Sequence, residues 1–148
     1  MYKRVLVPVD GSEAAEAIVP FIMQIAGPLD LDVVFVLVRQ PPPPVAGDGT
    51  VLSVENIDAA DAVANVYLAE LALKMERQGA RVETRVRRGR PTDEILAAAR
   101  DERIDMIAMT THGRTGPGRL LFGSVAEGVL RHADVPVFLM RQAAAVAR

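Results

Sequence analysis

A glycine-rich segment late in the chain, Thr110–Gly118, has the composition of an anion-binding loop. It holds three glycines, Gly113, Gly116 and Gly118. Glycine adopts positive φ without strain, so backbone amides there can converge on an anion. Gly123 and Ser124 follow at the start of a predicted helix, where free amides, the helix dipole and a hydroxyl favour a phosphate. Arg114 and Arg119 would supply counter-charge. The alternative is that the glycines serve only a surface turn.

Several common phosphate and metal motifs are missing from the sequence. The loop lacks Gly-Lys-Ser/Thr and is therefore not a Walker P-loop; the only lysines are Lys3 and Lys74. The first strand is not followed by the dinucleotide motif Gly-x-Gly-x-x-Gly. His112 could contact a phosphate or fill the turn, and together with His132 it lacks a third ligand for a metal.

A second segment, Pro8–Ser12, follows the first predicted strand and carries a carboxylate. Asp10 could accept hydrogen bonds from a ribose or help to hold Mg²⁺. The alternative role for Asp10 is local turn or cap chemistry for the helix that follows. Val38, at the end of the second predicted strand, could form a wall for an adenine ring or belong to the ordinary core.

Alternating strands and helices must position these two segments. The predicted strands are Arg4–Val9, Val33–Val38, Arg81–Arg87, Ile104–Met109 and Pro136–Met140. The predicted helices are Ser12–Gly27, Asp58–Gln78, Pro91–Arg103 and Ser124–His132. This order predicts an α/β fold, an open parallel sheet with helices on both faces. Ligands of such sheets bind beyond the carboxyl ends of the strands, where the strand order reverses.

Three local patterns refine this prediction. Pro20 should kink or divide the first helix. The strand Arg81–Arg87 alternates charged and apolar residues, which is typical of a half-buried sheet edge with one solvated face. The second helix is expected to bury one apolar stripe, namely Ala62, Val66, Ala69, Ala72 and Leu73.

Composition limits the classes of protein to consider. The 148 residues suit one domain, residues 1–148, with a Pro/Gly-rich connection at 39–57 and a short tail at 142–148. Seventeen basic residues against nineteen acidic ones argue against a nucleic-acid binder. The absence of Cys excludes disulfides and a cysteine nucleophile. No stretch is apolar enough to cross a membrane, so a cytoplasmic protein is expected.

Segments at both ends of the chain resemble universal stress proteins. The resemblance rests on Val5–Ser12, Thr111–Gly116, Leu120–Ala126 and Val135–Val137. The ATP-binding branch of that family carries Gly-x₂-Gly-x₉-Gly-Ser/Thr. Gly113, nine further residues and Gly123-Ser124 match the later part of this pattern, whereas Thr110 stands at its first glycine. The Thr110 side chain could crowd the ribose or the phosphates, or a strand-like backbone could absorb it.

The resemblance implies a Rossmann-like fold of the adenine nucleotide alpha-hydrolase type, with strand order 3-2-1-4-5. It also implies ATP as ligand, with Asp10 facing the ribose and as the candidate residue for Mg²⁺. Val9, Val38 and Met109 would lie near the adenine, and Pro8, Thr110 and His112 border the same site. The residues around the phosphates would be Gly113, Arg114, Gly116, Gly123, Ser124 and Val125.

The uncharged strand Pro136–Met140 falls at one edge of this sheet order. We expect it to pair with a second copy, as family members commonly dimerise through that edge. The favoured function is a binding module that holds ATP with little or no turnover. The alternatives are a homodimeric scaffold that binds no nucleotide, favoured by Thr110, and a slow ATPase or phosphotransferase.

Overall fold

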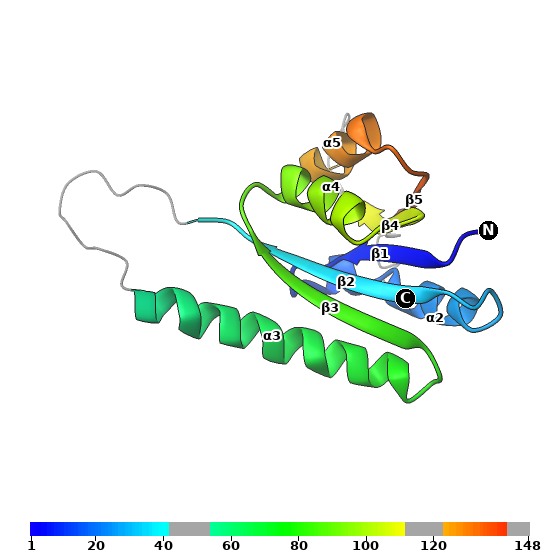
Figure 1. Cartoon of the computed structure of the whole chain (residues 1–148), viewed down its shortest axis with the longest axis horizontal. Coiled ribbons are helices and arrows are strands. Elements are labelled where there is room, and N and C mark those ends of the chain that lie inside the picture. Colours follow the sequence, from blue (N-terminus) through cyan, green and yellow to red (C-terminus); the bar gives the residue numbers. More distant parts are fainter. Residues whose placement is uncertain (42–53, 112–122, 142–148) are drawn as a thin grey trace, which may run out of the picture.

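Five parallel strands form one sheet in the order β3-β2-β1-β4-β5 (Figure 1). The computed structural model describes residues 1–41, 54–111 and 123–141. The strands are β1 (Arg4–Pro8), β2 (Asp32–Arg39), β3 (Arg81–Arg88), β4 (Met106–Thr111) and β5 (Val137–Arg141). The helices are α1 (Glu13–Glu16), α2 (Val19–Ala26), α3 (Val54–Glu76), α4 (Pro91–Asp101) and α5 (Ser124–His132). The predicted sheet order and parallel pairing are confirmed.

Helices cover both faces of the sheet, as expected. In Figure 1, α4 and α5 lie above the strands and α3 lies below them. Alternate residues of the buried strands feed two separate cores. Val7 and Phe35 pack toward the side of α2 and α3, whereas Leu6 and Ile107 pack toward α4 and α5. All four side chains are fully buried, which explains why these strands are almost continuously apolar.

The first predicted helix is divided, as the position of Pro20 suggested. The regular helix is interrupted at Ala17–Ile18, between α1 and α2, although both residues keep right-handed helical φ and ψ. Pro20 lies in the first turn of α2, where a missing N–H is tolerated. Since Pro20 cannot donate to the Glu16 carbonyl four residues earlier, one uninterrupted helix would lose that bond.

The apolar stripe predicted for α3 is wrong at four of its five positions. Val66 and Leu73 are 59% and 47% exposed, and Ala62 and Ala69 are also exposed; Ala72 alone is buried. The face that packs on the sheet instead carries Ala64, Leu68, Leu71, Ala72 and Met75. Alanine and valine occur on every side of this helix, so the sequence gives it little amphipathic contrast.

The element ends differ from the predicted ones in two places that matter below. β2 runs on to Arg39 and α3 begins at Val54, so the predicted connection 39–57 shortens at both ends. The ladder with β3 extends β2, because Arg39 pairs with Arg88. β5 ends at Arg141, one residue later than predicted, so its last residue is charged. In the described ranges, no helix combines the length and apolar composition needed to cross a membrane.

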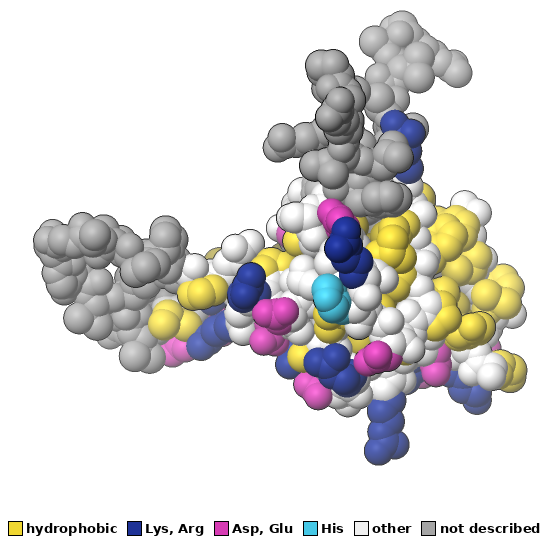
Figure 2. Space-filling view, turned by 90° about the horizontal axis from the view of Figure 1, so that it is seen from above, with side chains coloured by type: hydrophobic (Ala, Val, Ile, Leu, Met, Phe, Trp, Pro, Cys, Tyr) yellow, Lys and Arg dark blue, Asp and Glu magenta, His cyan; other side chains and the backbone are white. Residues whose placement is uncertain are grey.

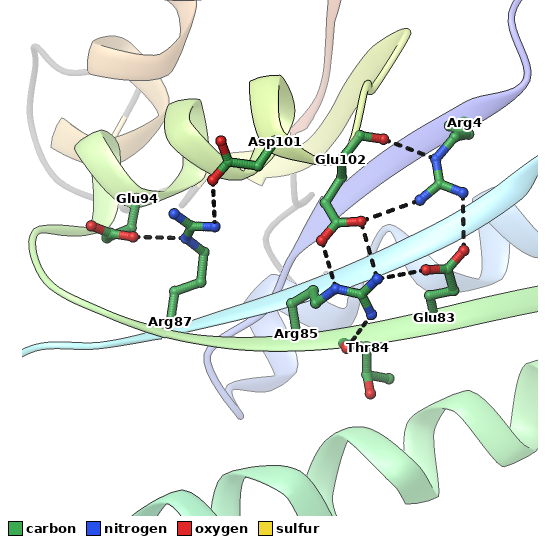
Figure 3. A network of polar contacts seen from close by, with 8 residues as sticks. All are labelled: Arg4, Glu83, Thr84, Arg85, Arg87, Glu94, Asp101 and Glu102. Carbon is green, nitrogen blue, oxygen red and sulfur yellow. Dashed lines mark hydrogen bonds and ion pairs between the residues drawn. The ribbon is translucent and has the colours of Figure 1, made fainter.

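The charged face of β3 is paired and not simply solvated. Figure 3 shows Arg85 between Glu83 of its own strand and Glu102 just after α4, with contacts of 2.7 and 2.6 Å. Arg4 of β1 reaches the same two carboxylates, at 2.9 and 3.4 Å. Arg87 contacts both Glu94 and Asp101. These ion pairs connect the edge strand to α4 on the face where no helix covers β3.

We expect Glu83→Gln to lower the free energy of unfolding at neutral pH, because it removes the charge that pairs with Arg4 and Arg85. The loss should be only about 0.5–1 kcal/mol, since Glu83 is partly exposed. Its bonds with Arg4 and Arg85 hold the pKa of Glu83 below its usual range. A lowered folded-state pKa contributes stability above the unfolded pKa and loses it as pH falls further. The parent should therefore lose more stability than the variant below about pH 4.5.

Chemical denaturation at a series of pH values measures both effects. Glu127→Gln is the matched control, since it breaks the exposed helical pair with Arg131 and should cost less than about 0.5 kcal/mol. Equal losses in acid for the parent and Glu83→Gln would show that Glu83 does not contribute through its charge.

Candidate functional site

Asp10 stands at the carboxyl end of β1 in a tight turn. Its Oδ1 accepts hydrogen bonds from the Ser12 amide at 2.9 Å and the Ser12 hydroxyl at 2.5 Å. Ser12 Oγ in turn accepts from the Ala15 amide at 3.1 Å and caps α1. Gly11 has φ +85°, a conformation that favours glycine. The turn-and-cap role considered for Asp10 is thus present, and both bonds use the same oxygen of an exposed carboxylate.

The ladder between β1 and β4 stops early, at the point where the strand order reverses. β1 pairs with β2 at five positions, but with β4 only at Val5 and Leu6. The Val9 amide donates to Val36 of β2, so the alternate residue Pro8 faces β4. Pro8 has no N–H to donate, which ends the pairing there. The carboxyl halves of β1 and β4 are therefore not joined beyond Leu6.

The three residues expected near an adenine do not share one face. Val38 and Met109 both pack toward the core beneath α4 and α5. Val9 packs toward α2 and α3 and is 4% exposed. A ligand above Val38 and Met109 would meet the main chain of Val9 and not its side chain.

Thr110 lies inside β4 and points toward α1. Its backbone is paired with Met140 of β5, and its φ is not positive. The hydroxyl lies 3.5 Å from the Ala15 carbonyl, at the outer limit for a hydrogen bond. The sequence left two alternatives for Thr110. In the structure, a strand-like backbone accommodates its side chain.

The first turn of α5 offers backbone donors. Gly123 is the N-cap residue, with φ −63° and ψ 156°, and no side chain among the described residues caps the helix. The first amides of a helix have no partner within it, so those from Ser124 onward are available to an anion. Ser124 is exposed, whereas Val125 is partly buried against the core. A Cβ on Gly128 would lie 2.8 Å from Thr92, so this glycine lets α5 pack closely on α4.

Four predicted site residues lie outside the described residues: His112, Gly113, Arg114 and Gly116. The structure therefore brings the end of β1, the end of β4 and the start of α5 to one edge of the sheet, without describing the loop between the last two. His132 lies in the last turn of α5, with Nδ1 3.0 Å from the Gly128 carbonyl.

Two arginines at this edge were not considered in the sequence. Arg39 and Arg88 end β2 and β3, and both make ion pairs with Asp61 of α3. These contacts lower the pKa of the Asp61 carboxyl. Because Asp61 already neutralises part of their charge, these arginines are weaker partners for a ligand than their position suggests.

Tyr67 of α3 is a second residue that sequence reasoning missed. Its hydroxyl is buried and has no hydrogen-bond partner within the described part of the chain. Burial and the nearby Glu16 carboxylate raise the pKa of Tyr67, so the phenol stays protonated near neutral pH. Tyr67 is far from Glu16 in the sequence, so no local pattern indicated that the two side chains would lie close together.

A five-stranded parallel sheet in this order, with helices on both faces, defines a protein of the doubly wound α/β class. The chain belongs to the universal stress protein family, whose family model matches residues 1–141. It is 29% identical over 146 residues to a universal stress protein of Methanocaldococcus jannaschii, covering 96% of this chain and 84% of that one.

Solved structures share this fold. Universal stress protein UspA from Lactobacillus plantarum superposes with a TM-score of 0.77 at 26% identity, covering 95% of this chain and 98% of that one. A universal stress protein solved in complex with cAMP has a TM-score of 0.71 at 24% identity, covering 95% and 97%. The universal stress protein from Archaeoglobus fulgidus in complex with dAMP has a TM-score of 0.62 at 24% identity, covering 93% and 97%.

Proposed function

We propose that this universal stress protein is a cytoplasmic module that binds ATP at the carboxyl ends of β1 and β4 and turns over little or none of it. The observations that carry the proposal are the first turn of α5, which no described side chain caps, and the exposed Asp10 carboxylate at the same edge of the sheet. An anion suits the free helix amides, and a ribose hydroxyl suits the carboxylate. Two proteins of the same fold, solved with cAMP and with dAMP, support an adenine nucleotide as the ligand class.

Each end of the nucleotide has a candidate partner. Val38 and Met109 would contact the adenine from one face of the sheet. The phosphates would lie at the start of α5, together with the glycines and Arg114 of the loop from Thr111 onward. Among the described residues, no three acidic or histidine side chains gather into a metal site. We therefore expect Mg²⁺ to be held by the phosphates themselves, with Asp10 as the protein's contribution.

We expect low turnover because neither lysine of the chain lies near the proposed phosphate position. A P-loop enzyme uses a lysine at the transferred phosphate. Lys3 precedes β1 and Lys74 lies in the last turn of α3, both at the amino-terminal edge of the sheet. ATP would then act as a bound ligand that stabilises one state of the protein.

Titration calorimetry with Mg-ATP tests the proposal directly. We expect saturable binding of one nucleotide per chain, and native mass spectrometry of the purified protein should show a retained adenine nucleotide. Inorganic phosphate release should remain at background over the same time. No heat with millimolar ATP and no retained nucleotide would exclude the proposed function, and steady phosphate release that depends on Asp10 would favour an enzyme.

We propose in addition that two copies associate through β5. This strand is the free edge of the sheet next to β4, and Val137–Met140 is uncharged. Phe138 is 36% exposed and stacks on Phe21 of α2, with ring centroids 4.8 Å apart. An unpaired strand edge of this kind invites pairing with another chain.

A further inference from the structure

A cavity of about 200 Å³ lies at the amino-terminal edge of the sheet, opposite the proposed nucleotide site. Its apolar lining includes Leu96, Ile104 and Ile107, which are nearly or fully buried. Arg100 and Arg103, at the end of α4, also line it. Figure 2 looks onto the face covered by α4 and α5, where apolar side chains gather toward the end at which Figure 1 places the N-terminus.

The backbone at Arg103 sets this residue apart. Three helices are followed by the same motif, in which the residue after a positive-φ residue donates its amide to the carbonyl five residues earlier. In α4 the Ile104 amide donates to the Ala99 carbonyl at 2.9 Å, and Arg103 carries φ +51°. The corresponding residue after α3 is Gly79, with φ +90°. Glycine is the usual residue there, because any Cβ is unfavourable in this conformation.

The comparison with α2 makes Arg103 more unusual still. Asp30 occupies the same position after α2, with φ +52°, and forms an ion pair with Arg81 at 2.8 Å. Aspartate also tolerates this conformation better than arginine does. Arg103 forms no ion pair with any residue that the structure describes, and neither does Arg100. An unfavourable backbone conformation thus holds Arg103 beside an apolar cavity, without an ion-pair partner among the described residues, and such outliers point to function.

Charge and shape define what the cavity would bind. Arg100, Arg103 and Asp134 are its charged lining residues, and their charges sum to one net positive charge. That balance suits a monoanion, because Asp134 would oppose a second negative charge. A guanidinium binds a carboxylate through two parallel hydrogen bonds. The volume equals about seven water molecules in the liquid, enough for a short chain or one ring.

We propose that this cavity binds a small organic monocarboxylate, whose apolar body fills the cavity and whose carboxylate is held by Arg100 and Arg103. The site lies at the other edge of the sheet and shares no residue with the proposed nucleotide site. This proposal can therefore be tested independently of ATP binding. The cavity would be a second site at which a small metabolite could bind the protein.

Hexanoate and its neutral analogue hexanamide are the probes. Titration of the ¹⁵N-labelled protein should give saturable shifts at Ile104 and neighbouring amides, with hexanoate binding roughly tenfold more tightly than hexanamide. Arg103→Gly should weaken hexanoate binding at least about fivefold while leaving the melting temperature unchanged or higher, because glycine relieves the backbone conformation. A purely structural role for Arg103 would not separate these two readouts.

Asp30→Gly is the matched control. It makes the same backbone change after α2, away from the cavity, and should leave hexanoate affinity unchanged. Equal affinity for hexanoate and hexanamide, unchanged binding in Arg103→Gly, or no saturable shift at tens of millimolar hexanoate would each overturn the proposal.

Discussion

Replacing Asp10 by alanine should lower the affinity for ATP roughly ten- to hundredfold, the range expected for one hydrogen bond to a charged group. The carboxylate is exposed, and its recorded bonds go only to Ser12. Removing it should therefore affect folding much less than binding. Titration calorimetry gives the affinity and thermal denaturation gives the stability, so the two effects are measured separately.

Ser12→Ala is the control that isolates the carboxylate from the turn. It removes the hydroxyl that donates to Asp10 and caps α1, but leaves the carboxylate and its bond from the Ser12 amide in place. It should cost about 1 kcal/mol of stability and only a small part of the affinity. If Asp10→Ala binds ATP as tightly as the parent does, Asp10 serves the turn alone and its assignment to the ribose is wrong.

Phe138→Lys should convert a dimer into a monomer, as measured by sedimentation equilibrium over a range of concentrations. Phe138 is the second of the five residues of β5, so pairing of two such edges would bring the new charges of both copies into the interface. Like charges on paired strands oppose association, and natural edge strands use lysine in this way. The parent should sediment as a dimer under the same conditions.

Phe138 also has a partner inside its own chain, so the experiment needs a second variant. Phe21→Ala removes the stacked ring of α2, which contributes about 0.5–1.5 kcal/mol, and leaves the strand edge unchanged. It should be less stable and still dimeric. A monomeric parent, or a Phe138→Lys variant that remains dimeric, would exclude β5 as the interface.

The framework of the fold could be predicted because its signals are local. Buried parallel strands read as short β-branched runs, and Pro20 marks the division of the first helix wherever the helix packs. The buried face of α3 could not be predicted, because Ala62 and Val66 look as apolar as Ala64 and Leu68. The fit of Leu68 against the sheet decides between these faces, and that fit exists only in the folded chain.

Some residues of the candidate sites could likewise be predicted from the sequence, and others could not. Asp10 and Gly123-Ser124 stand out in sequence, because turn and helix-start chemistry acts over a few residues. Arg103 does not, since its importance depends on a φ value and on a cavity shared with the α5–β5 connection. Asp61 forms ion pairs with Arg39 and Arg88, but it is far from both arginines in the sequence, so these pairs could not be predicted either.

Pro8 removes one backbone hydrogen bond that β1 and β4 could otherwise form. A residue with an N–H at this position would allow β1 and β4 to continue their ladder, and the extra bond would strengthen the sheet at its centre. The same bond would draw the two strands together beneath the proposed adenine position. We therefore expect a residue with an N–H at this position to strengthen the sheet and, at the same time, to narrow the proposed adenine position.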